Sequence, residues 1–207
     1  MRGVTAAKKN ISNVLATRYA SPEMTNLWSP EEKIKMERQL WLSVMKAQKE
    51  LGIEIPAEAP AAYEKVLDQV DLNSIAEREK VTRHDVKARI EEFNDLAGFE
   101  EIHKGMTSRD LTENVEQLQI YRSLVLARDK AIAVLNRIGR LAGEYQGLVM
   151  AGRSHNVAAQ ATTLGKRFAS AADELLLGLA RADELLARYT LRGIKGPMGT
   201  AQDMLDL

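Results

Sequence analysis

Two long stretches of helical periodicity constrain this chain more than any other feature of its sequence. Apolar residues recur every three or four positions for nearly forty residues from Thr107, and a second such pattern runs from about Val157 to Tyr189. At 1.5 Å per residue these helices would be roughly 50–60 Å long. Helices of that length need other helices packed along their whole apolar face. Two of them cannot enclose a core alone. We therefore expect a bundle that other chains or further sequence complete.

The first half of the chain carries shorter helical patterns with clear start and stop signals. Ser29, Pro30 and a glutamate two residues later predict a helix start, and Gly52 predicts its end. Three more short amphipathic helices are expected before Gly98. Because no strand-like alternation lasts more than a few residues, the sequence predicts an all-α fold. We expect a helical N-terminal domain over 1–110 and the first part of a long-helix bundle over 111–207.

The composition sets no special demand for a charged partner. Of 207 residues, 45% are hydrophobic, which is enough to bury a core. The 29 basic residues balance 29 acidic ones, so we expect neither nucleic acid nor a membrane as a partner. The longest strongly apolar run, 175–180, is too short to cross a bilayer. The absence of cysteine and of a signal-peptide pattern over Met1–Asn10 favours a cytoplasmic location.

All three histidines lie at predicted junctions between a loop and a helix. They are His84, His103 and His155, and each has hydroxyls, a glycine or an arginine beside it. Junctions are where rigid scaffolds display functional groups. One histidine in such a place would say little, but three of three favour a functional site.

His155 belongs to the most informative segment, Gly152-Arg153-Ser154-His155-Asn156, which we expect at the head of the second long helix. A helix start offers unpaired N–H groups that hold an anion, and histidine exchanges a proton near neutral pH. This combination suits an enzyme that acts on a polyanion. The alternative is a histidine that only caps the helix.

Two other segments have the residues to hold an anionic ligand. Thr107 and Ser108 precede the first long helix, and their hydroxyls with the helix N–H groups form either a carboxylate or phosphate seat or an ordinary N-cap. Arg83 and His84 offer a planar fork and a switchable cation, or else they begin an ordinary helical turn capped by Asp85.

Other chemistries lack their sequence signals. The histidines have neither H-x3-H nor H-E-x-x-H spacing and no cysteine assists them, so no metal site is predicted. Neither a G-x4-G-K-[ST] phosphate loop nor a G-x-S-x-G nucleophile elbow occurs. The polar stretch 18–24 has no helical periodicity and by itself predicts a loop.

Five segments stand out together along the chain: Arg18–Met24, Thr82–Val86, His103–Ser108, Gly152–Arg167 and Gly193–Thr200. In these segments and in their order, the chain resembles the adenylosuccinate lyase family of the fumarase/aspartase superfamily. Thr82-Arg83-His84-Asp85-Val86 is the most specific of them, whereas a Ser/Thr-His helix start is shared across the superfamily. The family often has Thr-His-Gly-Gln-Pro where this chain has Ser154 to Ala158, so Val157 lacks the hydrogen bond of the usual glutamine. The five matching segments are spread over almost the whole chain.

The resemblance implies an architecture as well as an activity. It implies a small helical N-terminal domain, a fumarase/aspartase-type central bundle of long helices, and a homotetramer whose active sites are shared between subunits. The family's mobile signature loop, with the serine thought to be the general base, would lie beyond Leu207. The chain therefore resembles the N-terminal half of such an enzyme, and we expect it to be inactive alone.

The resemblance also implies a carbon–nitrogen lyase that uses no cofactor or metal. It would release fumarate from adenylosuccinate, giving AMP, and from succinyl-aminoimidazole carboxamide ribotide in purine nucleotide biosynthesis. In this β-elimination a base removes the proton beside a carboxylate and an acid protonates the leaving nitrogen. By resemblance His155 is the acid and His84 assists it. The implied substrate-binding residues are Arg18, Tyr19, Arg83, His84, Asp85, His103, Thr107, Ser108 and Gln202, with Lys104 and Lys195 as weaker candidates.

Two alternatives stay open. One is another lyase of the superfamily, of the argininosuccinate lyase or carboxymuconate cycloisomerase type, against which the Thr82–Val86 segment argues. The other is a non-enzymatic helical assembly protein. That hypothesis explains the long helices but not the three histidines at junctions between a loop and a helix.

Overall fold

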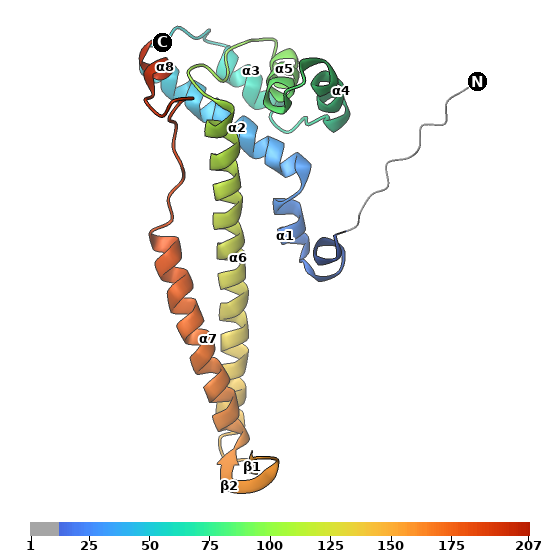
Figure 1. Ribbon diagram of the computed structural model, residues 1–207, viewed down its shortest axis with the longest axis vertical. Helices are drawn as coiled ribbons and strands as arrows, with labels where there is room; N and C mark the ends of the chain where they lie inside the picture. Colours follow the sequence, from blue (N-terminus) through green and yellow to red (C-terminus); the bar gives the residue numbers. More distant parts are fainter. Residues whose placement is uncertain (1–12) are drawn as a thin grey trace, which may run out of the picture. The chain divides into compact units, whose positions relative to one another are not determined.

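The computed structural model describes residues 13–207, which divide into two compact units, up to Lys104 and over 105–206 (Figure 1). Residues 1–10, which bear on the signal-peptide prediction, lie outside the described part. The predicted all-α class is confirmed: the described residues are mainly helical, with one small two-stranded sheet.

Helix starts in the first unit are set by capping residues. The Ser29 hydroxyl accepts a hydrogen bond from the Glu32 N–H at 3.1 Å, as predicted for this helix. Residues 18–24, predicted as a loop, are instead largely helical, because Ser21 caps a helix that is too short to show periodicity. The elements are a π-helical turn Leu15–Tyr19, α1 Pro22–Leu27, α2 Pro30–Glu50, α3 Ala59–Val66, α4 Leu72–Thr82 and α5 Asp85–Ala97.

The core of the first unit is aromatic and lies between α2, α3 and α5. Trp41 stacks on Phe93 with ring centroids 6.3 Å apart, and Tyr63 meets Phe93 edge-on at 4.8 Å. The Tyr63 hydroxyl lies 2.6 Å from both Asn94 Oδ1 and the Phe99 carbonyl oxygen. Burial raises the pKa of Tyr63 to about 12.

A buried ion pair joins α2 to α5 in the same core. The Arg38 guanidinium donates to the Glu92 carboxylate, and both side chains are almost fully buried. Nη1 of the same guanidinium donates to the carbonyl oxygens of Val66 and Leu67, at 3.0 and 2.9 Å. The guanidinium also lies over the Phe93 ring. The pair therefore ties together α2, α5 and the C-terminal end of α3.

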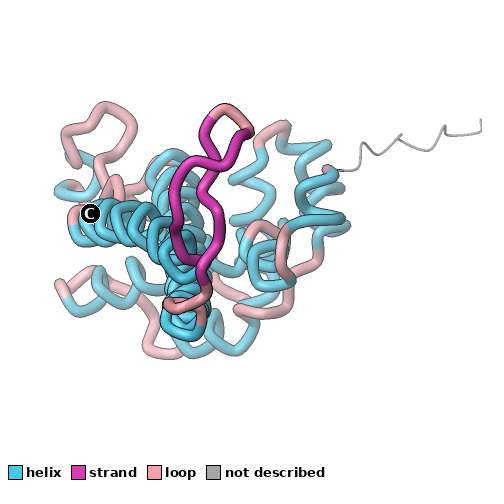
Figure 2. Tube along the Cα trace, turned by 90° about the horizontal axis from the view of Figure 1, so that it is seen from below, coloured by secondary structure: helices cyan, strands magenta, loops and turns pink. Residues whose placement is uncertain are grey.

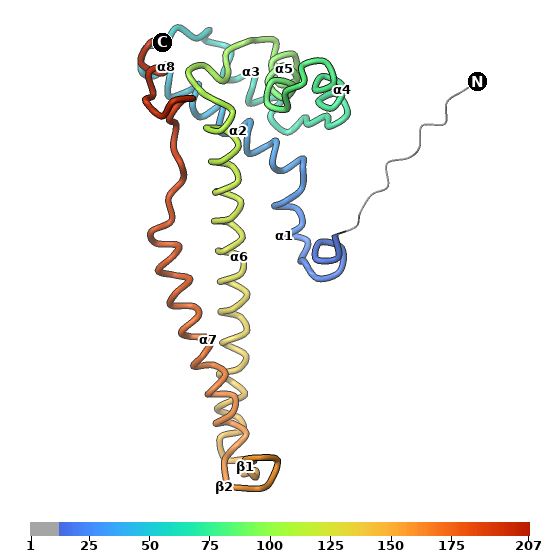
Figure 3. Tube along the Cα trace, in the orientation of Figure 1, coloured from blue at the N-terminus to red at the C-terminus, as the bar shows by residue number. Residues whose placement is uncertain are grey.

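The second unit is built on one long helix. Helix α6, Ser108–Glu144, is followed by strands β1, Val149–Ser154, and β2, Val157–Thr163. Helix α7, Leu164–Ala187, packs back along α6, and an extended segment then leads to the short α8, Gln202–Leu205 (Figure 3).

The hairpin corrects the prediction that the second long helix starts near Val157. Strands β1 and β2 pair antiparallel, with Val149 opposite Thr163 and Ser154 opposite Val157 (Figure 2). The helix starts seven residues later than expected, where the Thr163 hydroxyl accepts from the Lys166 N–H at 3.1 Å. The alanine-rich sequence of β2 hid a strand that pairing with β1 stabilises.

Gly165 allows α7 to begin against the end of α6. A Cβ at this position would lie 2.4 Å from the Ala142 carbonyl oxygen and 2.6 Å from the Gln146 backbone. The Gly165 N–H donates to the Tyr145 carbonyl oxygen at 2.9 Å. Any side chain here would push the two helices apart.

The α6–α7 pair leaves much of its apolar surface exposed. Its buried apolar side chains are few: Leu111, Val115 and Leu179. Val134 is 50% exposed and Leu177 is 59% exposed. This is the surface that two long helices cannot cover by themselves. No helix in the described part of the chain is both long and apolar enough to span a membrane.

Candidate functional site

The start of α5 displays three adjacent candidate residues. Arg83 adopts a left-handed conformation, with φ of 53°, which ends α4 and turns the chain sharply into α5. His84 then caps α5, because its Nδ1 accepts from the Lys87 N–H at 3.3 Å. His84 and Asp85 keep about half of their side-chain surface exposed. The predicted cap thus exists, but His84 and not Asp85 provides it, and the turn still presents a cation fork, an imidazole and a carboxylate.

Asp85 is held by an arginine that a buried carboxylate supports. Arg89 donates to Asp85 Oδ2 at 2.7 Å and to Glu37 Oε1 at 2.7 Å. Glu37 is fully buried, and its pKa is raised because burial penalises the charged form more than Arg89 favours it. Helix α2 therefore fixes the first turn of α5.

His103 lies against the aromatic core of the first unit. Its Nδ1 accepts a hydrogen bond from the Trp41 indole Nε1 at 2.9 Å, with the rings edge to face at 5.8 Å. An imidazole that accepts at Nδ1 carries its proton on Nε2. Trp41 thereby assigns the tautomer of His103. Lys104, one of the weaker candidates, forms an ion pair with Glu101.

Thr107 and Ser108 begin α6, as predicted, and are partly buried. The Thr107 N–H donates to Asp110 Oδ2 at 3.0 Å. Asp110 is fully buried. Burial alone would raise its pKa, but hydrogen bonds from the N–H groups of Lys195, Thr107 and Gly196, with the charge of Arg192, lower it.

His155 lies at the exposed tip of the hairpin and not at a helix head. His155 and Asn156 both have positive φ, 49° and 64°, as a two-residue type I′ turn requires. The prediction that helix N–H groups and a helix dipole act at His155 is therefore wrong. The turn instead lies at the tip of the β1–β2 hairpin, at the end of α6 and α7 that the two strands join (Figure 1).

The remaining candidates are exposed. The Arg18 guanidinium carbon lies 5.9 Å from the centroid of the Tyr19 ring in the π-helical turn. Gln202 begins α8 and donates to Asp206 Oδ1 at 2.7 Å. Lys195 has an exposed side chain, although its backbone N–H is bound to Asp110.

Some candidates come together in one chain and others do not. Arg83, His84 and Asp85 share one turn. Thr107 with Ser108 and His155 stand at opposite ends of α6, whose 37 residues span about 55 Å at 1.5 Å per residue. No small ligand bridges that length.

Sequence reasoning missed the residues that support these candidates. Trp41, Glu37, Arg89 and Asp110 carry the supporting contacts, and each belongs to a helix whose periodicity identifies it only as core or surface. A buried acid has no pattern that distinguishes it from an exposed one. No group of three or more acidic or histidine side chains suited to a metal ion occurs among residues 13–207.

The chain was compared with known proteins. A family model described as "Lyase" matches residues 13–204. The chain is 34% identical over 207 residues to adenylosuccinate lyase of Saccharomyces cerevisiae, covering 96% of this chain and 42% of that one. It is 35% identical over 189 residues to adenylosuccinate lyase of Methanothermobacter thermautotrophicus, covering 88% and 42%. The chain thus spans less than half the length of these curated relatives.

Solved structures share the fold. Fumarate lyase from Mesorhizobium sp. BNC1 superposes with a TM-score of 0.79 at 24% identity, covering 89% of this chain and 44% of that one. The 3-carboxy-cis,cis-muconate lactonizing enzyme from Pseudomonas putida gives 0.81 at 18% identity, covering 92% and 45%. The match along almost the whole chain and the shared helical fold lead to one conclusion: the chain belongs to the lyase family of the fumarase/aspartase superfamily.

Proposed function

We propose that this chain forms the N-terminal half of an adenylosuccinate lyase. The observation that carries the proposal is the exposed turn of Arg83, His84 and Asp85, within the segment most specific to that lyase, in a chain about one-third identical to adenylosuccinate lyases. The substrates would be adenylosuccinate and succinyl-aminoimidazole carboxamide ribotide. Each would lose fumarate, and the first would leave AMP.

The chemistry assigns one proton transfer to this chain. The bond between carbon and the leaving nitrogen breaks as a base takes the proton beside a carboxylate, and the electron pair forms the double bond of fumarate. His155, exposed at the hairpin tip, protonates the leaving nitrogen, and His84 assists. The base comes from beyond Leu207. The reaction needs no cofactor.

The binding residues suit a substrate with a phosphate and two carboxylates. Arg83 supplies a fork for an anion, with Asp85 and His103 as further polar contacts, while Thr107 and Ser108 offer hydroxyls at a helix start for a succinyl carboxylate. Arg18 and Tyr19 take the phosphate end, and Gln202 contacts the substrate. Val157 in place of glutamine removes one hydrogen bond near His155.

The length of α6 supports a site shared between copies of this chain. His155 and the Thr107–Ser108 pair serve one substrate only if they come from different subunits, since about 55 Å separates the two ends of the helix. The exposed apolar surface of α6 and α7 supplies the contact area for such an assembly. We propose a homotetramer in the cytoplasm.

A substrate panel on the complete protein tests this function. Adenylosuccinate, argininosuccinate and 3-carboxymuconate are each supplied, and fumarate or lactone formation is followed. Turnover of adenylosuccinate at a kcat/KM at least about 100-fold above the others supports the proposal. Preference for another substrate would replace it with a different lyase of the superfamily. No turnover of any of the three would favour the assembly protein.

A further inference from the structure

Asp110 carries a cluster of contacts that the function above does not assign. Its Oδ1 accepts from Arg192 Nη1 at 2.7 Å and from the Lys195 N–H at 2.9 Å. Its Oδ2 accepts from the Gly196 N–H at 3.0 Å, besides the Thr107 N–H at the start of α6. Four donors converge on one buried carboxylate. A capping role alone would need only one of them.

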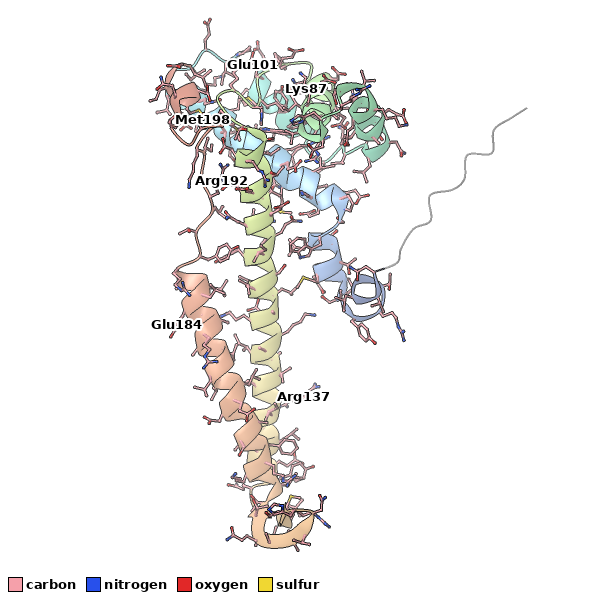
Figure 4. All side chains as sticks on the ribbon, in the orientation of Figure 1. Lys87, Glu101, Arg137, Glu184, Arg192 and Met198 are labelled. Carbon is pink, nitrogen blue, oxygen red and sulfur yellow. The ribbon has the colours of Figure 1, made fainter. Side chains whose placement is uncertain are left out.

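Asn114, one turn further along α6, holds the same segment. Its side-chain amide donates to the Gly193 carbonyl oxygen at 2.9 Å, and its Oδ1 accepts from the Gly193 N–H at 2.9 Å. Figure 4 shows Arg192 beside the upper part of α6, with Met198 further along the segment. The segment 192–196 is thus held on the first turns of α6 mainly by hydrogen bonds of its own backbone to Asp110 and Asn114.

The docked segment in turn places α8. The Ala201 N–H donates to the Lys195 carbonyl oxygen at 3.1 Å. A Cβ added to Gly196 would lie 3.3 Å from Asp203 Oδ2, so the chain folds back closely here, and the φ of Gly196, 69°, is one that glycine adopts freely. Gln202 lies between Ala201 and Asp203. Its position therefore depends on the contacts of Asp110.

We propose that Asp110 is a positioning residue that holds the Lys195–Gln202 turn against the start of α6, so that Gln202 faces the substrate together with Thr107 and Ser108. This inference rests on the proposed function for its catalytic part. Its structural part stands on the contacts of the second unit alone. Asp110 itself touches no substrate, because its side chain is fully buried.

The structural part is tested by limited trypsin digestion of the complete protein. Asp110→Asn keeps the shape of the side chain but places an NH₂ group against two of the four donors, whichever way the amide turns. Cleavage after Arg192 and Lys195 follows the open population of the segment, so we expect it to accelerate about 10- to 100-fold. Asn114→Ala, which frees Gly193 and leaves the buried charge in place, provides a second variant and should accelerate it too.

Glu113→Gln is the matched control. It removes the other carboxylate partner of Arg192, at 3.0 Å from Nε, and leaves Asp110 untouched. Because this pair is partly exposed, cleavage should stay within about twofold of the parent protein. Equal cleavage in all four proteins would overturn the structural part of the proposal.

The catalytic part is tested by a double-mutant cycle with Gln202→Ala on adenylosuccinate. Misplacement of Gln202 should cost Asp110→Asn about 10- to 100-fold in kcat/KM. In the Gln202→Ala background the same change should cost several-fold less than in the parent protein, since one of the residues that Asp110 positions is gone. An equal cost in both backgrounds would refute positioning through Gln202. If the complete protein does not turn over adenylosuccinate, the proposed function fails, and the digestion still decides the structural part.

Discussion

The buried pair between Arg38 and Glu92 should make the first unit sensitive to the loss of one charge and tolerant of the loss of both. Arg38→Met would remove the donor to Glu92 and to two carbonyl oxygens, those of Val66 and Leu67. It would leave the Glu92 carboxylate buried without its cation. Breaking a buried pair on one side costs about 3–5 kcal/mol, a large part of a total stability of about 5–15 kcal/mol.

The double variant Arg38→Met/Glu92→Leu should recover most of that loss. It removes both desolvated charges and fills the space with apolar groups, which is often neutral within about 2 kcal/mol. Its remaining cost comes from three groups that lose a partner: the Asp71 N–H, which donates to Glu92 Oε1 at 3.4 Å, and the carbonyl oxygens of Val66 and Leu67, which accept from Arg38. Lys46→Met is the matched control on the same helix, because its ion pair with Glu64 is exposed, and it should cost less than about 1 kcal/mol.

Urea denaturation followed by far-UV circular dichroism measures these differences in the free energy of unfolding. All variants of the chain must be compared at one protein concentration, since self-association adds to the apparent stability. A loss below about 1 kcal/mol for Arg38→Met would refute the reasoning. So would a double variant as unstable as the single one.

Three more outcomes are expected. In the complete protein, His155→Ala should lower kcat by about 100-fold or more at an unchanged melting temperature, whereas a normal kcat would remove the acid role. The 207-residue chain alone should show little lyase activity and should sediment as an oligomer at micromolar concentration, because the α6–α7 face is apolar and exposed; a stable monomer would contradict this. The pKa of Asp110 is lowered in the folded state, so the charged carboxylate stabilises the fold fully above pH 3.8, its ordinary pKa, and this stabilisation is lost as the pH falls below that value. The difference in urea midpoint between the parent chain and Asp110→Asn should therefore narrow below pH 3.8 and stay constant above it.

Periodicity and caps predicted most of the helices, because those signals are local. The start of α2 at Ser29 and Pro30 follows from the side chain that meets the first free N–H groups. Helix α6 follows from an apolar repeat too long to be accidental. In both cases the residues that decide the structure lie within a few positions of the atoms they contact.

The hairpin could not be predicted in the same way. The alanines of β2 suit a helix at least as well as a strand, and what decides is the pairing of Val149 with Thr163 across fourteen positions. The residue types at the turn were only a weak signal for it. Asparagine and histidine both tolerate the positive φ that His155 and Asn156 adopt, but neither residue requires it. A longer-range contact thus overrode the local preference.

In the candidate site, too, local features could be predicted from the sequence and contacts between distant residues could not. The turn of Arg83, His84 and Asp85 could be located from its helix-start pattern. The contacts that orient it could not, because Arg89 and Glu37 lie on different helices and look like ordinary surface and core positions. The assignments to His155, Thr107 and Gln202 remain predictions.

Helix α6 also restricts which insertions and deletions the chain tolerates. Each added residue moves everything beyond it by about 1.5 Å and turns it by about 100° around the helix axis. Adding or removing a single residue within Ser108–Glu144 would therefore swing the hairpin to another side of the bundle, while even a whole seven-residue repeat would displace it by about 10 Å along the axis. Length variation belongs instead in exposed connections such as Pro56 to Glu58, where no element depends on a fixed phase.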